Sequence, residues 1–231
     1  MLKWFRENRR DLPWRGTRDP YAILVSEVML QQTQVSRVVP RWHRWMERWP
    51  TVRSLAAASR ADVIRAWQGL GYNRRALALW KAAQVVAADG WPADLTELPG
   101  VGRYTADALA CFAFGKQVLP VDVNVRRVLE RSRMQFGPQH AQALMDLGAT
   151  VCLARVPRCS ECPLAEQCPS SGRRFEPVRK QGPFAGSFRQ RRAQALRAVA
   201  EGRDPADPDA VAALERDGLV EIRSGGARLP A

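Results

Sequence analysis

Apolar residues recur every three or four positions through the first 150 residues, and prolines and glycines interrupt the pattern. This is the period of helices that bury one face in a core. Trp42, Trp45 and Trp49 illustrate it, because their spacing places the three indole rings on one helix face, where we expect them to be buried. We find no convincing strand pattern in this region. The pattern therefore predicts an all-α body.

Capping residues indicate where several of these helices begin. Asp19-Pro20, Ser54 and Ser59 each precede an apolar periodic run. Short polar side chains and proline are favoured at the first turn of a helix. We expect helices to begin at these positions. A further helix is expected to begin near Arg103, after a short helix and a turn that contains glycine.

The composition changes after residue 170. Residues 171–192 contain seven basic residues and one acidic residue with Pro and Gly among them, which is typical of a basic linker. Helical patterns follow at about 190–200 and 207–217, and then two short strand-like runs around a Gly-Gly turn. This order resembles a minimal winged-helix module, and a small tail packed on the body without a DNA role is equally open. We expect a body of residues 1–170, this linker, and a module of residues 193–231.

The charge of the chain bears on its partner. Lysine and arginine outnumber aspartate and glutamate by 36 to 23, which gives a formal charge of +13. Such a charge favours a polyanion, with nucleic acid first. A membrane is disfavoured, because there is no run of 18 apolar residues and the charged start has no apolar signal-peptide core behind it. We expect a cytoplasmic, nucleoid-associated monomer.

Four of the five cysteines are crowded into residues 152–168. Cys152, Cys159, Cys162 and Cys168 form the pattern C-x6-C-x2-C-x5-C, which can enclose a metal centre in one compact loop. Zinc is the competing interpretation, although zinc sites more often pair two C-x2-C knuckles far apart in sequence. The residues alone leave both metals open.

A glycine turn separates two predicted helices in the segment LTELPGVGRYTADALACFAFG. Gly100 and Gly102 permit a tight turn with exposed backbone N–H groups, and the following helix adds its positive N-terminal end. Such a turn can bind a phosphate oxygen without any side chain, and therefore without regard to base sequence.

Several strings together resemble one family. LPGVGRYTA, the V-D-V-N-V string of residues 121–125, and ALMDLGA ahead of the cysteines resemble the helix-hairpin-helix superfamily of DNA glycosylases that contains endonuclease III and MutY. The resemblance covers roughly residues 4–170. It implies a two-lobed all-α fold in which the four cysteines hold a 4Fe-4S cluster. It also implies a partner, double-stranded DNA that contains a mispair or a damaged base.

The string SEVMLQQTQV at residues 26–35 is similar to the adenine-removing MutY branch. Tyr104 agrees, because bifunctional members carry a lysine at this point of the hairpin and form a Schiff base with the sugar. The resemblance therefore implies a monofunctional enzyme. Its reaction would be hydrolysis of the N-glycosidic bond of adenine mispaired with 8-oxoguanine or guanine.

Excision of a base needs a proton for the leaving base and an anion that stabilises positive charge on the sugar. Glu27 would be the acid, because apolar neighbours would raise its pKa towards neutrality. Asp122 would be the anion, close to the start of a helix whose dipole favours the charged form, and Asn124 would support it. The motif match is what selects these residues.

The resemblance also implies contacts with the DNA. The strip RDLPWR, with Arg10 and Trp14, would line the adenine pocket, and the GLGY string would be a wedge that enters the duplex. The residues that would fill or prop the gap left by the flipped adenine, or help to hold the base, are Gln31, Gln32, Thr33, Tyr72 and Asp146.

Some features depart from the family pattern. Only residues 132–143 separate the V-D-V-N-V helix from the ALMDLGA helix, where typical members have a further helical stretch. Ala141 and Asn73 replace a usual Asn and a usual aromatic residue. The large C-terminal domain that reads 8-oxoguanine is expected to be absent or reduced. Two alternatives stay open: excision of thymine or uracil from mismatches with guanine, and a non-catalytic protein that binds DNA damage.

Overall fold

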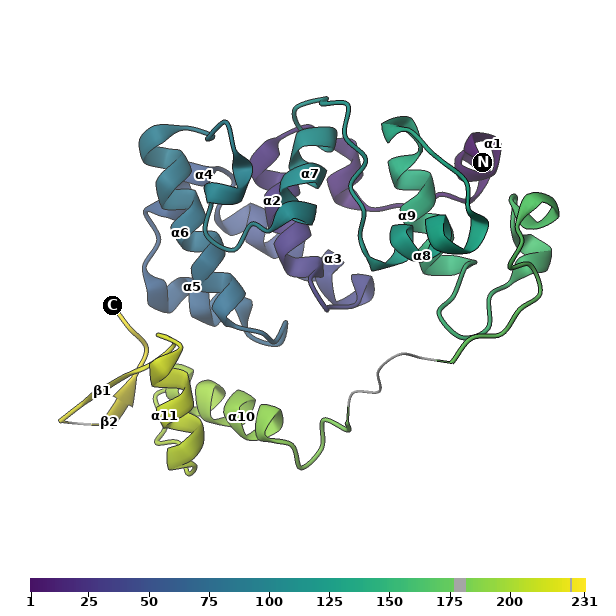
Figure 1. Ribbon diagram of the computed structural model, residues 1–231. Coiled ribbons are helices and arrows are strands. Elements are labelled where there is room, and N and C mark those ends of the chain that lie inside the picture. The colour runs from purple at the N-terminus through teal and green to yellow at the C-terminus, as the bar shows by residue number, and fades with distance from the viewer. Residues whose placement is uncertain (177–181, 225) are drawn as a thin grey trace. The chain divides into compact units, whose positions relative to one another are not determined.

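The computed structural model describes residues 1–176, 182–224 and 226–231, and it divides the chain into two compact units. The first unit is Met1–Leu24 with Gly102–Lys180, and the second is Val25–Val101 with Gln181–Ala231. Both are built mainly of helices, and among the described residues the only strands are two short ones near the C-terminus (Figure 1). The predicted all-α body is confirmed.

The first unit consists of helices and of the cysteine-rich loop. Helices α8 and α9 pack against each other, and α1 packs against α9. Their shared core includes Val125, Val128, Leu144 and Leu147, all of which are buried. The helices are α1 (Leu2–Asn8), the start of α2 (Pro20–Leu30), α7 (Arg103–Phe112), α8 (Val123–Ser132) and α9 (Ala141–Thr150), with 3-10 turns at Pro13–Gly16, Pro138–His140, Cys159–Glu161 and Ala165–Gln167.

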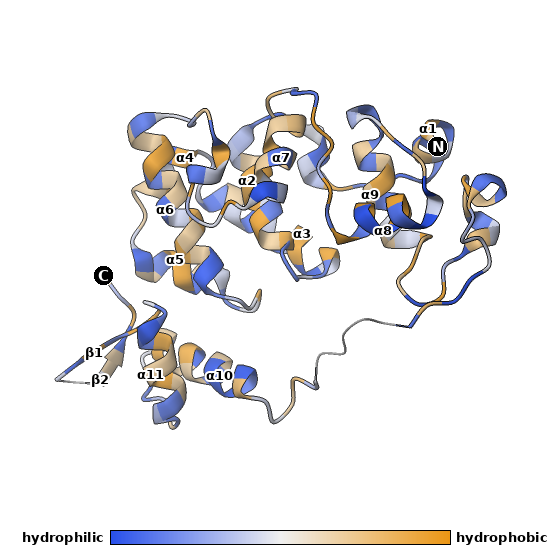
Figure 2. Ribbon diagram, viewed as in Figure 1, coloured by the Kyte–Doolittle hydropathy of each residue, from blue (hydrophilic) through white to orange (hydrophobic). Residues whose placement is uncertain are grey.

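The second unit contains the remaining helices and the strand pair. Its core includes Trp42, Trp45 and Trp49, which are all buried as their spacing predicts. Along α6, hydrophobic residues are interspersed with hydrophilic ones, as expected of a helix that buries one face (Figure 2). The helices are the end of α2, α3 (Val35–Arg48), α4 (Val52–Ala56), α5 (Arg60–Trp67), α6 (Arg74–Asp89), α10 (Phe188–Ala200) and α11 (Pro208–Arg216), with a 3-10 turn at Leu95–Glu97.

Most of the predicted helix starts are confirmed. Helix α2 begins at Pro20, α7 begins at Arg103, and Ser59 caps α5 by accepting the backbone N–H of Asp62. The start predicted at Ser54 is wrong, because α4 begins two residues earlier. Thr51 is the N-cap there, and Ser54 completes a reciprocal capping box from inside the helix.

The C-terminal helices and strands pack on the second unit. Strands β1 (Glu221–Arg223) and β2 (Gly226–Arg228) pair antiparallel, next to the two helices predicted there (Figure 1). Residues of α10 and α11 share a core with Ile64 of α5 and Leu77 of α6. The domain boundaries at 170 and 192 stay predictions, and residues 177–181 of the predicted linker and residue 225 of the predicted turn lie outside the described residues.

The structure also bears on the membrane question. Within the described ranges, no helix combines the length and the hydropathy that crossing a membrane requires.

Candidate active site and cysteine-rich loop

Asp122 is the N-cap of α8, so it lies at the positive end of a helix, as the sequence predicts. Its Oδ1 accepts the backbone N–H groups of Asn124 at 2.9 Å and Val125 at 2.7 Å. Its Oδ2 accepts the side-chain amide of Asn124 at 3.0 Å. Both carboxylate oxygens are therefore held in place, and the expected support from Asn124 is visible in the structure.

Arg127 continues this network toward the cysteine-rich loop. Its Nη2 donates to Oδ1 of Asn124 at 2.8 Å and to the carbonyl of Gly148 at 2.6 Å. Its Nε donates to the carbonyl of Cys152 at 2.7 Å. Burial lowers the pKa of this guanidinium below its ordinary value. A continuous series of hydrogen bonds thus joins the backbone of Cys152 to the carboxylate of Asp122.

Gly148 allows α8 and α9 to come together at this point. A Cβ atom at Gly148 would lie 2.8 Å from both Cβ and the carbonyl oxygen of Asn124, closer than real Cβ contacts allow. The glycine of the ALMDLGA string is therefore required by the packing around the candidate catalytic residues.

Asp146 is fully buried and is held by two arginines. Arg10 donates to it through its backbone N–H at 3.0 Å and its Nε at 2.6 Å, and Arg15 donates through Nη1 at 2.8 Å and Nη2 at 2.7 Å. Burial alone would raise the pKa of Asp146, but the hydrogen bonds from Arg15 and Arg10 and the charge of Arg15 hold it below its ordinary value. The structure shows Asp146 anchoring the strip that includes the buried Trp14, and its contact with a base stays a prediction.

Glu27 lies in the middle of α2, where residues 21–29 are all buried. Its side chain is 7% exposed, as expected for a carboxylate among apolar neighbours, and its raised pKa stays a prediction. Glu27 belongs to the second unit and Asp122 to the first.

The hairpin is locally built as its glycines predict. Gly100 has φ +78°, and a Cβ there would lie 2.6 Å from Cβ of Ala78, so both conformation and packing require glycine. Gly102 is the N-cap of α7, and open space surrounds the position of its missing Cβ. Tyr104 is the second residue of α7 and is half-buried.

The predicted gap-filling residues and the predicted wedge are brought together by one side chain. Arg75 donates to the carbonyl of Gln31, to Oγ1 of Thr33 and to the carbonyl of Gly71, at 2.6, 3.1 and 3.0 Å. Tyr72, which the sequence predicts to be the wedge residue, is 46% exposed. Gln32 and Tyr72 both have positive φ, at 56° and 46°.

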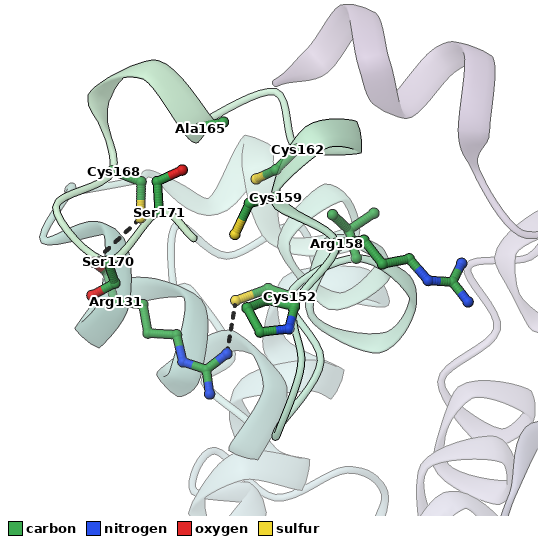
Figure 3. Close-up of a pocket in the computed structure, with 11 residues that line it drawn as sticks. Arg131, Cys152, Arg158, Cys159, Cys162, Ala165, Cys168, Ser170 and Ser171 are labelled. Atoms are coloured by element: carbon green, nitrogen blue, oxygen red, sulfur yellow. Dashed lines mark hydrogen bonds between the residues drawn. The ribbon is translucent and has the colours of Figure 1, made fainter. Parts of the chain in front are cut away.

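The four clustered cysteines line one pocket of the first unit (Figure 3). All four are free thiols, and Arg131 lies beside them with its Nη1 3.5 Å from Sγ of Cys152. The backbone N–H of Gly172 donates to Sγ of Cys159 at 3.3 Å. Burial raises the pKa of the Cys162 thiol, the N–H of Leu164 lowers it, and the other three cysteines raise it further.

The geometry of these thiols bears on the kind of metal centre they could hold. Within the described part of the chain, no group of three or more His, Cys, Asp or Glu side chains is arranged around a single ion. Four cysteine thiols around one pocket are a donor set that both a structural zinc ion and an iron-sulfur cluster use. The donor chemistry therefore fits either kind of metal centre.

Comparison with known proteins places these features in a family. Residues 25–147 match the HhH-GPD superfamily of base excision DNA repair proteins. The adenine DNA glycosylase of Mycolicibacterium smegmatis is 42% identical, over 98% of this chain and 93% of that protein. The chain belongs to the adenine DNA glycosylases of this superfamily. The Mycobacterium tuberculosis H37Rv relative is 43% identical over 85% of this chain and 76% of its own, and the human relative is 39% identical over 81% and 42%.

Solved structures confirm the predicted fold. A thermostable thymine-DNA glycosylase superposes with a TM-score of 0.65 at 30% identity, over 73% of this chain and 91% of that one. A trapped endonuclease III–DNA covalent intermediate gives 0.62 at 24% identity, over 73% and 90%, which supports the fold alone.

This glycosylase is shorter than its relatives inside the region that matches them. The alignment with the M. smegmatis protein runs over 272 positions, more than the 231 residues of this chain, so the relative has additional residues within it. Here a single 3-10 turn, Pro138–His140, lies between α8 and α9. That segment is where the sequence predicts a shortened connection.

Sequence reasoning missed three arginines that organise these sites: Arg75, Arg127 and Arg131. Each occurs on a helix, where an arginine usually points to solvent. The four-residue spacing of Arg127 and Arg131 places both on one face of α8 and was the available signal. No comparable pattern marks Arg75.

Proposed function

We propose that the protein is a monofunctional DNA glycosylase that hydrolyses the N-glycosidic bond of adenine mispaired with 8-oxoguanine or guanine in double-stranded DNA. The observation that carries the proposal is the carboxylate of Asp122, whose two oxygens are fixed at the N-terminus of α8. The sequence identity of the protein to an adenine DNA glycosylase over nearly the whole chain favours adenine as the base that is removed.

The reaction divides between two carboxyl groups. Glu27, buried in α2, donates a proton to a ring nitrogen of adenine, so that the bond from C1′ of the sugar breaks and neutral adenine leaves. Asp122 stabilises the positive charge that develops on the sugar. A water molecule then adds to C1′, and its proton returns to the carboxylate of Glu27.

DNA binding is assigned to the backbone and to two loops. The N–H groups at Gly102 and at the start of α7 bind a phosphate, aided by the positive end of that helix. Tyr72 and the loop of Gln31, Gln32 and Thr33 enter the duplex, and the strip with Arg10 and Trp14 lines the base pocket. We propose that the enzyme acts as a monomer.

We also propose that Cys152, Cys159, Cys162 and Cys168 hold a 4Fe-4S cluster. Four free thiols around one pocket support this, with Arg131 and the N–H of Gly172 directed at two of the sulfur atoms. A bound cluster would stabilise the loop and could exchange electrons. Metal analysis of protein purified without oxygen should find four irons per chain, whereas one zinc per chain would refute the proposal.

The catalytic assignment is tested by single-turnover excision from a panel of mispairs. Wild-type protein should release adenine opposite 8-oxoguanine and guanine. Glu27→Gln and Asp122→Asn should each lose about 100-fold or more in rate while still binding the duplex. Glu130→Gln is the matched control, since Glu130 is exposed on the same helix as Asp122, and its rate should be unchanged. Release of adenine at the wild-type rate by either variant would overturn the assignment.

Excision of thymine is a second candidate, favoured by the 30% identity to a thymine-DNA glycosylase. The same panel of mispairs separates thymine excision from adenine excision. If the protein were a thymine glycosylase, it would release thymine opposite guanine and leave the adenine mispairs intact. Tight binding with no base released from any duplex, unchanged by Asp122→Asn, would instead identify a non-catalytic binding protein. Borohydride should trap no covalent adduct, because Tyr104 cannot form a Schiff base.

A further inference from the structure

Two residues predicted to enter the DNA have backbone conformations that residues other than glycine seldom adopt. Gln32 has φ +56° and Tyr72 has φ +46°. Among the described residues, Arg133 is the only other non-glycine residue with a positive φ. Left-handed conformations of such residues persist when the surrounding contacts over-determine them. The loops that contain Gln32 and Tyr72 must therefore be held in these conformations by contacts with neighbouring residues.

Arg75 provides those contacts on the side of the Gln31–Thr33 loop. Its Nη1 donates to the carbonyls of Val28, Met29 and Gln31, at 2.7, 3.1 and 2.6 Å. Its Nη2 donates to Oγ1 of Thr33 at 3.1 Å. The end of α2 and both neighbours of Gln32 are thus bound to one guanidinium.

The same guanidinium also holds the wedge, residues 69–72. Nη2 donates to the carbonyls of Leu70 at 3.4 Å and Gly71 at 3.0 Å, and Nε donates to the carbonyl of Tyr72 at 3.3 Å. The charged group lies 5.3 Å from the ring centre of Trp67 and 5.4 Å from that of Tyr72. Every N–H-bearing nitrogen of the side chain is therefore engaged with a loop.

Helix α3 completes the support of the wedge. Arg41 donates to the carbonyl of Gln68 at 3.3 Å, and Arg37 donates to the carbonyl of Gly69. The five consecutive carbonyls of residues 68–72 therefore all accept a hydrogen bond from an arginine side chain. Rotation of the wedge would break several of these bonds together.

Only arginine suits the position of Arg75. Its planar fork has five N–H donors, whereas lysine has one ammonium group with three. Burial lowers the pKa of Arg75 to about 10, so the group keeps its charge at neutral pH. A lysine would retain the charge and lose most of the directed hydrogen bonds.

We infer that Arg75 is a positioning residue, which holds the Gln31–Thr33 loop and the wedge in their DNA-inserting conformations before DNA arrives. The inference rests on the proposed function, since it assumes that the protein flips a base out of the duplex. Preformed loops need no ordering during binding, so that more of the binding energy is available for extrusion of the adenine.

The test compares Arg75→Lys with wild type and with Arg74→Gln, a change at the neighbouring, mostly exposed side chain. The fluorescent base 2-aminopurine replaces the adenine opposite 8-oxoguanine, and its emission reports unstacking. Arg75→Lys should reduce this signal and the single-turnover rate by about tenfold or more. Its affinity should fall more for the intact mispair than for a duplex with an abasic site, where no base has to be extruded.

A merely structural role predicts something different. Loss of folded protein would lower the affinity for both duplexes equally, and that result, or an unchanged fluorescence signal, would overturn the inference. A wild-type protein that neither flips nor excises the base would overturn the proposed function, and this inference with it.

A second measurement does not depend on the folding of a variant. In wild-type protein without DNA, the backbone amide hydrogens of Thr33 and Leu70 should already exchange slowly, because they donate to the carbonyls of Leu30 and Trp67 within loops that the arginines hold in place. Fast exchange there, with protection appearing only when DNA is added, would show that DNA orders the loops and would overturn the inference.

Discussion

Asn124 accepts a hydrogen bond from Arg127 at 2.8 Å and donates one to Asp122 at 3.0 Å. Because Arg127 also binds the carbonyl of Cys152, the orientation of the candidate catalytic carboxylate depends on the cysteine-rich loop. We predict that Arg127→Lys slows single-turnover excision by about tenfold, since the ammonium cannot reach Asn124 and Cys152 together. Quenched-flow measurement of adenine release checks this.

Arg126→Lys is the control for that prediction, because Arg126 is the exposed neighbour on α8. It should excise at the wild-type rate. The iron content of both variants should be measured too. An Arg127→Lys protein with the full wild-type rate would mean that the network does not orient Asp122.

Gly148→Ala should destabilise the first unit. The new methyl group would lie 2.8 Å from the backbone and Cβ of Asn124, so α8 and α9 would have to move apart. Overpacking of this kind costs about 1–3 kcal/mol, and we expect urea unfolding to show a loss in that range. Gly182→Ala is the control, because nothing lies within 4 Å of the added atom. Equal stability of the two variants would contradict the tight packing described above.

The stability of the protein should depend on pH through Asp146. Its pKa in the folded protein lies below the ordinary value, because hydrogen bonds from Arg15 and Arg10 outweigh the effect of burial. The ionised carboxylate of Asp146 therefore contributes to the free energy of unfolding. This contribution is fully present above the ordinary aspartate pKa of about 3.9, and it is lost as the pH falls through the lower pKa of the folded protein. Asp146→Asn removes it at every pH and leaves two arginines without their partner, at a cost of about 3 kcal/mol near pH 7.

Urea unfolding across the acid range measures this effect. The difference in unfolding free energy between wild type and Asp146→Asn should narrow below about pH 4, because there the Asp146 carboxylate of the unfolded chain takes up a proton before that of the folded protein does. Asp89→Asn, a change at an exposed side chain at the end of α6, should match wild type throughout. A difference that stays constant down to pH 2 would show that the charge of Asp146 contributes nothing.

The predictions from sequence succeeded where the signal is local. Asp122 is an N-cap because of its residue type and its place just before a helical pattern. The helical spacing of the tryptophans predicts the burial of Trp42, Trp45 and Trp49. Both signals come from residues that are close together in the sequence. The start of α4 was misplaced because Thr51 and Ser54 are both good caps, and only the folded chain selects one.

The arginine networks could not be predicted, for a physical reason. Arg75 binds the carbonyls of residues 28, 29, 31 and 70–72, and a carbonyl is present at every residue whatever its side chain. Nothing in the residue types therefore marks these acceptors. Asp146 shows the same limit: its partners Arg10 and Arg15 lie more than 130 positions away in the sequence.

The C-terminal module should unfold together with the rest of the second unit. Leu214 of α11 is 1% exposed, and its core also includes Ile64 and Leu77 of the preceding helices. We expect Leu214→Ala to cost about 2–5 kcal/mol, as is usual for a buried leucine. Because the core is shared, tryptophan fluorescence and backbone circular dichroism should report one transition at the same lowered urea midpoint. An early transition seen by circular dichroism alone would show that the module folds independently, as a separate winged-helix domain would.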